Sequence, residues 1–318
     1  MTLILTFASP SGIVQVGDRL VSASVGKNFF PLDEFSTKQI VYRASDAVVT
    51  IGYAGQALLG GVPTDEVIAA QLSGDPTLGN RRGRGRGAIS MGGMINRWSI
   101  THAVRHLRRK LASQLSVGQE LQLCIAGFKR DAGSFRPMLE DIILKPDGKS
   151  EIRHTPREWP STYFAISAIG FDCRRVVAAV SERIKAQPPA FDQLPAFLTE
   201  QIRQFNAPGI GKDTSAITIP RFGIIESEFF PMSRRHSVLQ ISDSGSQIAF
   251  GVEYHPWVIG WTTLKRPTAG AGHDVEIHDT SGFSVRLKGT GNELPNGLLS
   301  AFSSVPRFNQ STTLDPDL

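Results

Sequence analysis

Four residues near the start of the chain, Thr2, Asp18, Lys38 and Gly55, have types that could support acyl-transfer chemistry. A threonine hydroxyl is a weak nucleophile, and a terminal α-amine with a pKa of about 8 can serve as its base. Removal of Met1, which the small threonine permits, would give Thr2 that amine. A lysine ammonium beside the hydroxyl would lower the local proton affinity, and a carboxylate would keep the lysine charged and oriented. A glycine N–H could approach the reacting carbonyl oxygen.

Short strands and tight turns are predicted around these residues. Alternating aliphatic and β-branched residues over 3–8 and 13–16, with a Ser-Pro-Ser-Gly turn between them, predict a hairpin. A second hairpin is expected over 38–53. The intervening segment, 20–37, is expected to leave the sheet as an ordered excursion that lines a cleft. Each residue alone has an ordinary interpretation as a polar turn, a solvated strand end or a turn glycine, so only their combination points to catalysis.

The order of the remaining elements predicts a layered α+β fold. Helices are expected from Pro63 and over 96–115, 173–185 and 191–205, and strands over 121–128, 136–144, 162–169 and 214–220. Runs of strands followed by runs of helices favour layered α+β over a doubly wound sheet.

The composition changes near residue 223, where Gly, Ser and Thr become frequent. We therefore predict a first domain over 1–222 and a small β-rich C-terminal module over 223–318. The polar tail after Pro306 is expected to be disordered.

The first domain resembles the proteasome-like threonine peptidases of the N-terminal-nucleophile hydrolase superfamily, which include the bacterial ATPase-partnered threonine peptidase. Thr2, Gly12 and Asp18 fall at the family's spacing without a gap, and Lys38 opens a strand as the family's lysine does, a few residues later. Gly52-Tyr53-Ala54-Gly55 resembles the family's segment that supplies an oxyanion-hole N–H. The resemblance extends to about residue 221 and implies a four-layer αββα sandwich of the N-terminal-nucleophile hydrolase type.

The same resemblance implies a function and a set of catalytic residues. It implies a threonine-nucleophile amidohydrolase, most directly a peptidase, acting on a peptide or small amide after Met1 is removed. The implied catalytic residues are Thr2, Asp18, Lys38 and Gly55, with no cofactor and no metal. Because the family forms rings, a homo-oligomer is expected. The alternative is a catalytically inactive proteasome-like scaffold or binding protein.

The chain departs from the family's pattern in the loop before the last strand of the first domain. Active members carry an Asp and a Ser there, beside the threonine amine, whereas this chain has Gly209 and Lys212 near those positions. Asp213 or Ser215 could replace them if the loop is shifted. The segment 167–170 matches the family's Gly-Ser-Gly only loosely. An active hydrolase and an inactive relative therefore both stay open.

Composition argues against several other classes of protein. The sequence contains no long uncharged apolar run that would predict a membrane span. It also contains no basic and apolar leader that would predict secretion, so a cytoplasmic protein is expected. Cys124 and Cys173 are too few for a disulfide framework and are expected to be reduced. The net charge is +5, with one Arg-Gly run over 81–87. That run is short and lacks interleaved aromatics, so an exposed loop is favoured over nucleic-acid binding.

Three further motifs carry weaker signals. His102 and His106 have an i, i+4 spacing that can bind a metal, but no third ligand is evident, so a surface or interface pair is favoured. The segment 209–212 lacks the full spacing of a phosphate-binding loop. Trp257 and Trp261 are expected on one face of a strand, where core packing is favoured over a ligand platform.

Overall fold

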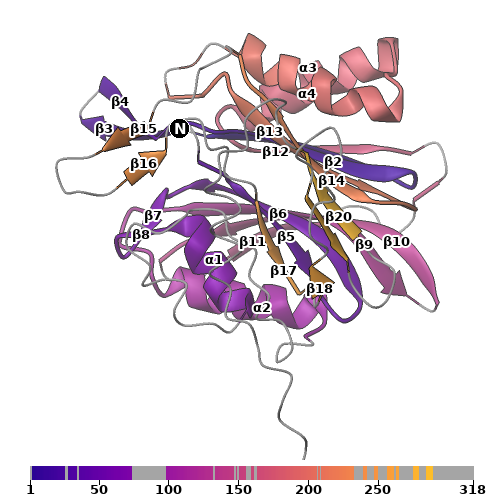
Figure 1. Ribbon diagram of the computed structural model, residues 1–318, viewed down its shortest axis with the longest axis horizontal. Coiled ribbons are helices and arrows are strands. Elements are labelled where there is room, and N and C mark those ends of the chain that lie inside the picture. Colours follow the sequence, from indigo (N-terminus) through magenta and orange to yellow (C-terminus); the bar gives the residue numbers. More distant parts are fainter. Residues whose placement is uncertain are drawn as a thin grey trace, which may run out of the picture.

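The computed structural model has two stacked β-sheets, each covered on its outer face by a pair of helices (Figure 1). It describes residues 2–25, 28–33, 36–73, 98–131, 133–146, 148, 150–154, 159–160, 163–205, 207, 209–232, 239–241, 247–249, 256–260, 263–264, 275–278 and 284–288. The Arg-Gly run at 81–87, Trp261 and the tail after Pro306 lie outside these residues.

The first sheet contains the opening hairpin. Its order is β12 (Ala165–Gly170), β1 (Leu3–Ser9), β2 (Gly12–Asp18), β13 (Thr214–Pro220), β14 (Ile225–Phe230), β20 (Ser284–Leu287), β19 (Val275–His278) and β18 (Thr263–Leu264). Neighbouring strands are antiparallel except for β14 and β20, which are parallel.

The second sheet contains the second hairpin. Its order is β11 (Ser150–His154), β10 (Ser134–Leu144), β9 (Leu121–Asp131), β6 (Ala47–Gly55), β5 (Gln39–Arg43) and β17 (Trp257–Ile259). Two-stranded ribbons are formed by β3 (Val21–Val25) with β4 (Asn28–Asp33), β7 (Leu58–Leu59) with β8 (Val62–Pro63), and β15 (Leu239–Ile241) with β16 (Gln247–Ala249).

The helices pack according to the apolar stripes in their sequences. On the second sheet lie α1 (Thr64–Ser73) and α2 (Ile100–Ala112); on the first lie α3 (Cys173–Ala186), the short 3₁₀ turn η2 (Phe191–Gln193) and α4 (Leu194–Gln204). Helix α2 begins at Ile100 rather than near residue 96, because the Ser99 side chain accepts a hydrogen bond from the His102 N–H and caps the helix. Its buried residues Val104, Leu107 and Leu111 face the sheet.

Three apolar clusters follow from this layering. One lies between α1, α2 and the second sheet, one between the two sheets, and one between the first sheet, α3 and α4. Strand alternation distributes residues among them: in β1, Leu3 and Leu5 contact the helix side while Ile4 contacts the opposite sheet. The expected α+β class is confirmed, while the finer assignment to the N-terminal-nucleophile hydrolase type stays a prediction.

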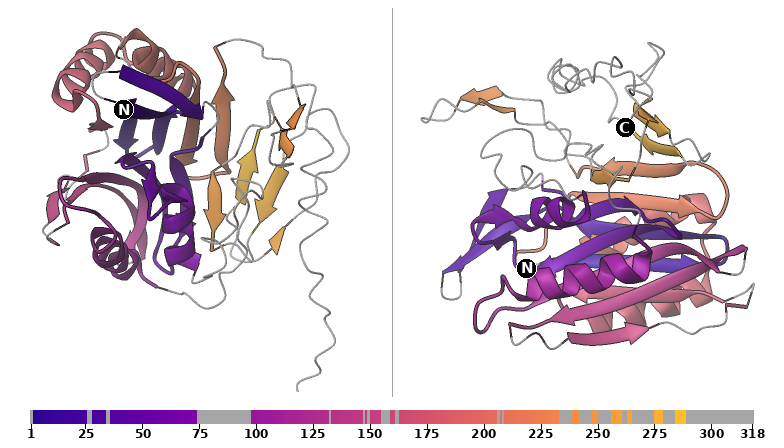
Figure 2. Two further views of the ribbon diagram at one scale, coloured as in Figure 1. Left: turned by 90° about the vertical axis from the view of Figure 1, so that its left-hand side faces the viewer. Right: turned by 90° about the horizontal axis from the view of Figure 1, so that it is seen from below.

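The strands after residue 222 join both sheets as well as forming the β15–β16 ribbon. β14 extends the first sheet beside β13, and β17 pairs with β5 at the edge of the second. In Figure 2 the yellow strands, which lie late in the chain, continue the first sheet beyond β14. The boundary at 222/223 therefore marks a change in composition, and a division of the chain there stays a prediction.

A buried polar layer crosses the space between the sheets. The Gln15 amide group donates to the Thr6 hydroxyl at 3.1 Å and to the Cys124 carbonyl at 3.3 Å, and it accepts from the Thr50 hydroxyl at 2.8 Å. Gln15 and Thr50 are fully buried. Because Gln15 lies on the first sheet and Thr50 on the second, these bonds fix the position of one sheet against the other.

We expect Gln15→Leu to lower the free energy of unfolding by about 1–3 kcal/mol, because it leaves the buried Thr50 hydroxyl without its acceptor. The double variant Gln15→Leu/Thr50→Val should lose less stability than the sum of the losses of the two single variants. Chemical denaturation of both single variants and the double variant measures this coupling. The exposed Gln114→Leu is the control and should change stability little. Additive effects of Gln15→Leu and Thr50→Val would contradict a direct bond between the sheets.

Candidate functional site

The sequence-predicted residues meet at one end of the sandwich. The register pairs Leu3 with Gly170, Asp18 with Thr214, and Gln39 with Gly52. Neighbouring antiparallel strands run in opposite directions, so the start of one strand lies beside the end of the next. This end of the sandwich therefore contains Thr2 before β1, Asp18 at the end of β2, Lys38 before β5 and Gly55 at the end of β6.

Asp18 is the polar centre of the site. Its Oδ1 accepts a hydrogen bond from the Leu3 N–H at 2.8 Å, and its Oδ2 accepts from Lys38 Nζ at 2.9 Å and from the Gly211 N–H at 3.1 Å. Lys38 Nζ also donates to the Leu20 carbonyl at 2.6 Å. One carboxylate thereby joins β1, the strand entering the second sheet, and the loop before β13.

The Asp18–Lys38 ion pair is buried, with side-chain exposures of 0% and 3%. Taking two charges out of water costs several kcal/mol for each ion, which a good geometry and further hydrogen bonds can offset. Here Asp18 receives three hydrogen bonds, and Lys38 has a backbone acceptor besides the carboxylate. The pair therefore persists in the interior because further hydrogen bonds surround it.

We expect Lys38→Met to reduce stability by about 3–5 kcal/mol, because it leaves the Asp18 charge buried without a counterion. The double variant Asp18→Asn/Lys38→Met should lose less than the sum of the single variants. Urea unfolding followed by circular dichroism provides the measurement. The control is Lys145→Met, which breaks an exposed pair with Glu151 and should cost at most about 1 kcal/mol. Equal losses for the two lysine variants would contradict a structural role for the buried pair.

Thr2 is held from the opposite side by the turn that follows β12. The Thr2 carbonyl accepts a hydrogen bond from the Phe171 N–H at 2.9 Å. Gly170 has a φ of 99°, and a Cβ placed there would lie 1.9 Å from the Thr2 carbonyl oxygen. Glycine is therefore required at position 170 both for its backbone conformation and for the close approach of Thr2.

Gly55 is the exposed last residue of β6, on the same edge. Its φ is 108°, and a Cβ there would lie 2.4 Å from the Glu120 carbonyl oxygen. The preceding residue, Ala54, lies beside Gly170: a Cβ on Gly170 would come within 3.4 Å of the Ala54 Cβ. The structure thus places the end of β6 next to the backbone that holds Thr2.

The loop before β13 does not place its polar side chains in the Asp18 network. Lys212 Nζ donates to the Arg203 and Phe205 carbonyls at the end of α4. The Asp213 carboxylate accepts from the Met232 N–H at 2.7 Å, and the Ser215 hydroxyl donates to the Gln39 side chain at 2.8 Å. The loop contributes the Gly211 N–H to Asp18, so neither Asp213 nor Ser215 replaces the family's acid and serine in this structure.

A second polar cluster was missed by the sequence analysis. The Ser167 hydroxyl lies 2.7 Å from Asp141 Oδ1 and 2.6 Å from Oδ2, and the Cys124 thiol lies 3.2 Å from the Thr6 hydroxyl. Strand parity could have found it, because Asp141 shares a strand face with Leu139, which packs between the sheets. An acid on an inward-facing position of β10 is the signal.

Burial controls the titration of this cluster. It raises the pKa of the Asp141 carboxyl, an effect that hydrogen bonds from Ser167 and Cys124 and the charge of Arg153 partly oppose. Burial also raises the pKa of the Cys124 thiol well above its ordinary value. Cys124 is therefore a neutral thiol at physiological pH, and Asp141 takes up a proton more readily than an exposed aspartate.

We expect Asp141→Asn to gain stability relative to the natural protein as the pH rises from about 3.5 to 7. A raised carboxyl pKa favours folding below the unfolded-state pKa of about 3.9, and this contribution is lost as the pH rises through the folded-state pKa. The amide of the variant does not titrate, so the variant lacks that loss. Urea unfolding at several pH values measures the difference.

A companion variant sharpens the prediction for Asp141. Ser167→Ala removes hydrogen bonds that lower the pKa of Asp141, so the loss of stability should extend to higher pH. A stability difference between Asp141→Asn and the natural protein that does not change with pH would contradict this account.

The histidine pair on α2 packs against an aromatic ring. The Trp98 ring centroid lies 4.8 Å from that of His102 and 4.6 Å from that of His106, and His106 Nε2 lies 3.1 Å from the Gln71 side chain. Burial, followed by the charge of Arg109 and other nearby cations, lowers the pKa of His106. Within the described residues, no group of three or more metal-ligating side chains occurs.

Two further sequence motifs have ordinary positions in the fold. The segment 209–212 forms part of the loop at Asp18, as described above. Trp257 lies on β17, opposite Ile40, while Trp261 lies outside the described residues. No helix in the described part of the chain combines the length and apolar character needed to cross a membrane.

Comparisons with known proteins identify no relative. No protein-family model matches the chain, and no curated protein matches it. The resemblance to the threonine peptidases therefore depends on the residues and spacing given above.

Proposed function

We propose that this protein is an amidohydrolase of the N-terminal-nucleophile type, with Thr2 as its nucleophile and peptides or small amides as its substrates. The proposal includes the four-layer αββα sandwich of that superfamily and a homo-oligomeric, ring-like assembly. It requires processing that removes Met1 and exposes the amine of Thr2.

One observation carries the proposal. Asp18 binds the Leu3 N–H and the Lys38 ammonium at the same time, at 2.8 and 2.9 Å. Leu3 follows Thr2 directly, so the Asp18 carboxylate holds the buried Lys38 ammonium beside the first residues of β1, next to the proposed nucleophile.

The residues at this edge can each take a role in amide hydrolysis. The Thr2 hydroxyl oxygen would attack the amide carbonyl carbon while the Thr2 amine accepts the hydroxyl proton. The amine would then pass that proton to the leaving nitrogen as the C–N bond breaks. Lys38 would lower the proton affinity of the hydroxyl, and the Gly55 N–H would stabilise the negative oxygen. Water would finally cleave the acyl-threonine ester and regenerate the hydroxyl.

A second candidate function is supported by the loop before β13. Lys212, Asp213 and Ser215 are all bonded away from the Asp18 network. The chain therefore lacks, in this loop, the acid and serine that assist the amine in active members. That arrangement favours a scaffold or binding protein that keeps the sandwich and the buried ion pair without catalysing hydrolysis.

The deciding experiment begins with the intact mass of the purified protein, which should correspond to loss of Met1. A threonine-directed epoxyketone should then label the protein once, at Thr2. Thr2→Ala should abolish labelling and lower amide hydrolysis by roughly a thousandfold or more, because the nucleophile is gone. Thr2→Ser should retain labelling, and the surface variant Thr101→Ala should behave as the natural protein does.

Two outcomes reject the hydrolase. Retention of Met1 leaves Thr2 without a free amine, and the mechanism above then fails. Removal of Met1 without labelling by the epoxyketone supports the inactive scaffold instead.

A further inference from the structure

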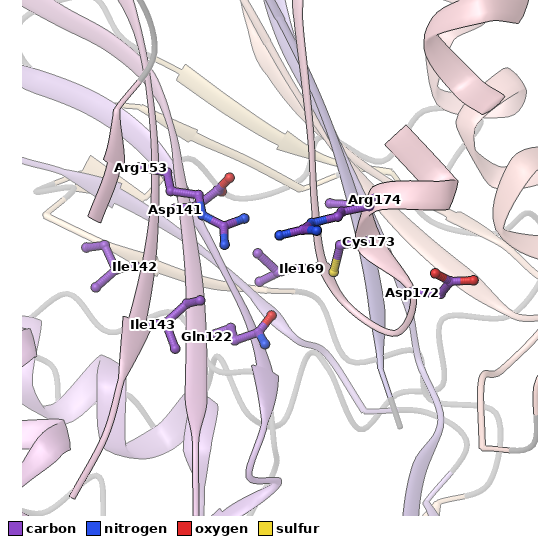
Figure 3. A pocket seen from close by; sticks show the side chains of 10 residues that line it. Gln122, Asp141, Ile142, Ile143, Arg153, Ile169, Asp172, Cys173 and Arg174 are labelled. Atoms are coloured by element: carbon purple, nitrogen blue, oxygen red, sulfur yellow. The ribbon is translucent and has the colours of Figure 1, made fainter. Parts of the chain in front are cut away.

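A cavity of about 420 Å³ opens near the end of β12, between the edges of the two sheets (Figure 3). Its walls come from β9, β10, β11, β12 and the first turn of α3. At about 30 Å³ for each water, it could hold roughly a dozen water molecules, and its size lies in the range of small-molecule sites.

Two arginines dominate the charge of this cavity. Arg153 on β11 and Arg174 on α3 line it from opposite sides, and Figure 3 shows their guanidinium groups pointing toward each other across the centre. Among the described residues, neither arginine has an ion-pair partner within 4.0 Å. By contrast, the neighbouring Arg175 pairs with Asp172 at 3.9 Å.

Two facing cations repel each other, and an anion placed between them would be attracted to both. Asp141 opposes this positive charge only in part, because its single negative charge, which interacts with Arg153, offsets one of the two arginines. Asp172 lies at the rim, next to Arg175. The cavity is therefore left with an excess of positive charge.

We propose that this cavity binds a small carboxylate, with its anionic head held between Arg153 and Arg174 and its aliphatic part against Ile143 and Ile169. A guanidinium presents parallel N–H donors that match the two oxygens of a carboxylate. The apolar walls suit a short carbon chain, and Gln122 supplies a polar group at the edge of the cavity.

The cavity adjoins the backbone that holds Thr2. The Gly170 N–H donates to the Gln122 side chain at 2.8 Å, and the Cys173 thiol lies 3.1 Å from the Gly170 carbonyl oxygen. Phe171 in turn binds the Thr2 carbonyl. The turn at 170–173 therefore separates a ligand in the cavity from the start of β1.

Two sources could supply the carboxylate: an acidic side chain of a substrate bound at Thr2, or a free small dicarboxylate. The first source rests on the proposed hydrolase, whereas the second does not require that Thr2 be catalytic. Binding is therefore tested in the Thr2→Ala variant, so that failure of the hydrolase and failure of this site give different results.

Isothermal titration of Thr2→Ala with glutarate, and with its uncharged analogue glutaramide, tests the site directly. We expect saturable binding of glutarate and none of glutaramide. Arg153→Gln and Arg174→Gln should each weaken glutarate binding by about tenfold or more, the effect of losing one charge-assisted contact. The matched control is Arg105→Gln, which removes an exposed arginine on α2 that does not line the cavity and should leave the affinity unchanged.

Glutarate binding should also depend on pH. An anion beside Asp141 favours its protonated form, so binding should be coupled to proton uptake and should be stronger at about pH 5 than at about pH 7. The charged and titratable groups that face Asp141 are Arg153, Arg174, Asp172 and the thiols of Cys124 and Cys173. Asp141→Asn should remove this pH dependence without abolishing binding.

Cys173 gives an independent readout, because it lines the cavity. A negatively charged methanethiosulfonate should modify Cys173 faster than a positively charged one, and glutarate should protect it. Mass spectrometry distinguishes Cys173 from the buried Cys124. In Arg174→Gln the preference for the negative reagent should fall.

Three results would overturn the proposal: no saturable glutarate binding, equal effects of Arg174→Gln and Arg105→Gln, or tighter binding of inorganic phosphate than of glutarate. If glutarate binds, hydrolysis of acidic and neutral peptides by the unmutated protein identifies the source. A preference for acidic peptides that is lost in Arg174→Gln assigns the site to the substrate, and its absence assigns the site to a free carboxylate.

Discussion

The buried ion pair between Asp18 and Lys38 is the interaction on which the end of the sandwich depends. Its carboxylate holds β1 through Leu3, the second sheet through Lys38 and the loop before β13 through Gly211. A charge at this depth must keep all of its partners, because losing one leaves an unpaired ion in the interior. The position of the first residues of β1 is thereby tied to both sheets.

The space between the sheets combines apolar and polar contacts. Aliphatic side chains fill much of it, while Gln15, Thr50 and Cys124 form a polar layer across it. Apolar packing alone is nondirectional and would allow one sheet to slide over the other, whereas hydrogen bonds between buried groups require a particular alignment. The polar layer also leads to Asp141, whose raised pKa reflects the cost of placing a carboxylate in this interior.

The functional proposals use two neighbouring parts of one edge. The Asp18–Lys38 pair and the turn at Gly170 hold Thr2, and the same turn borders the cavity lined by Arg153 and Arg174. The side chains of Lys212, Asp213 and Ser215 bind groups outside the Asp18 network. They therefore supply no acid and no serine to assist the amine of Thr2. A positive cavity beside the start of β1 would suit an acidic ligand whether or not Thr2 performs hydrolysis.

Local patterns in the sequence were sufficient for most of the strands and helices of the first 222 residues and for the α+β class. Alternation and turn residues located the hairpins over 3–16 and 38–53, and helical spacing located α2, α3 and α4. The spacing of Thr2, Asp18 and Lys38 also predicted residues that share one edge of the sandwich. These features depend on residues close together in the chain, so a single sequence contains their signal.

The pairing of distant strands was decided only by tertiary structure. β14, β20 and β17 join the two sheets formed mainly by the first 222 residues, although the change in composition near residue 223 suggested a separate module. The cavity likewise brings together Arg153, Asp141 and Arg174 from three elements, and the side chains of Lys212 and Asp213 bind the end of α4 and the segment after β14. Such contacts depend on which edges and faces meet after folding, and no local pattern of residue types specifies that.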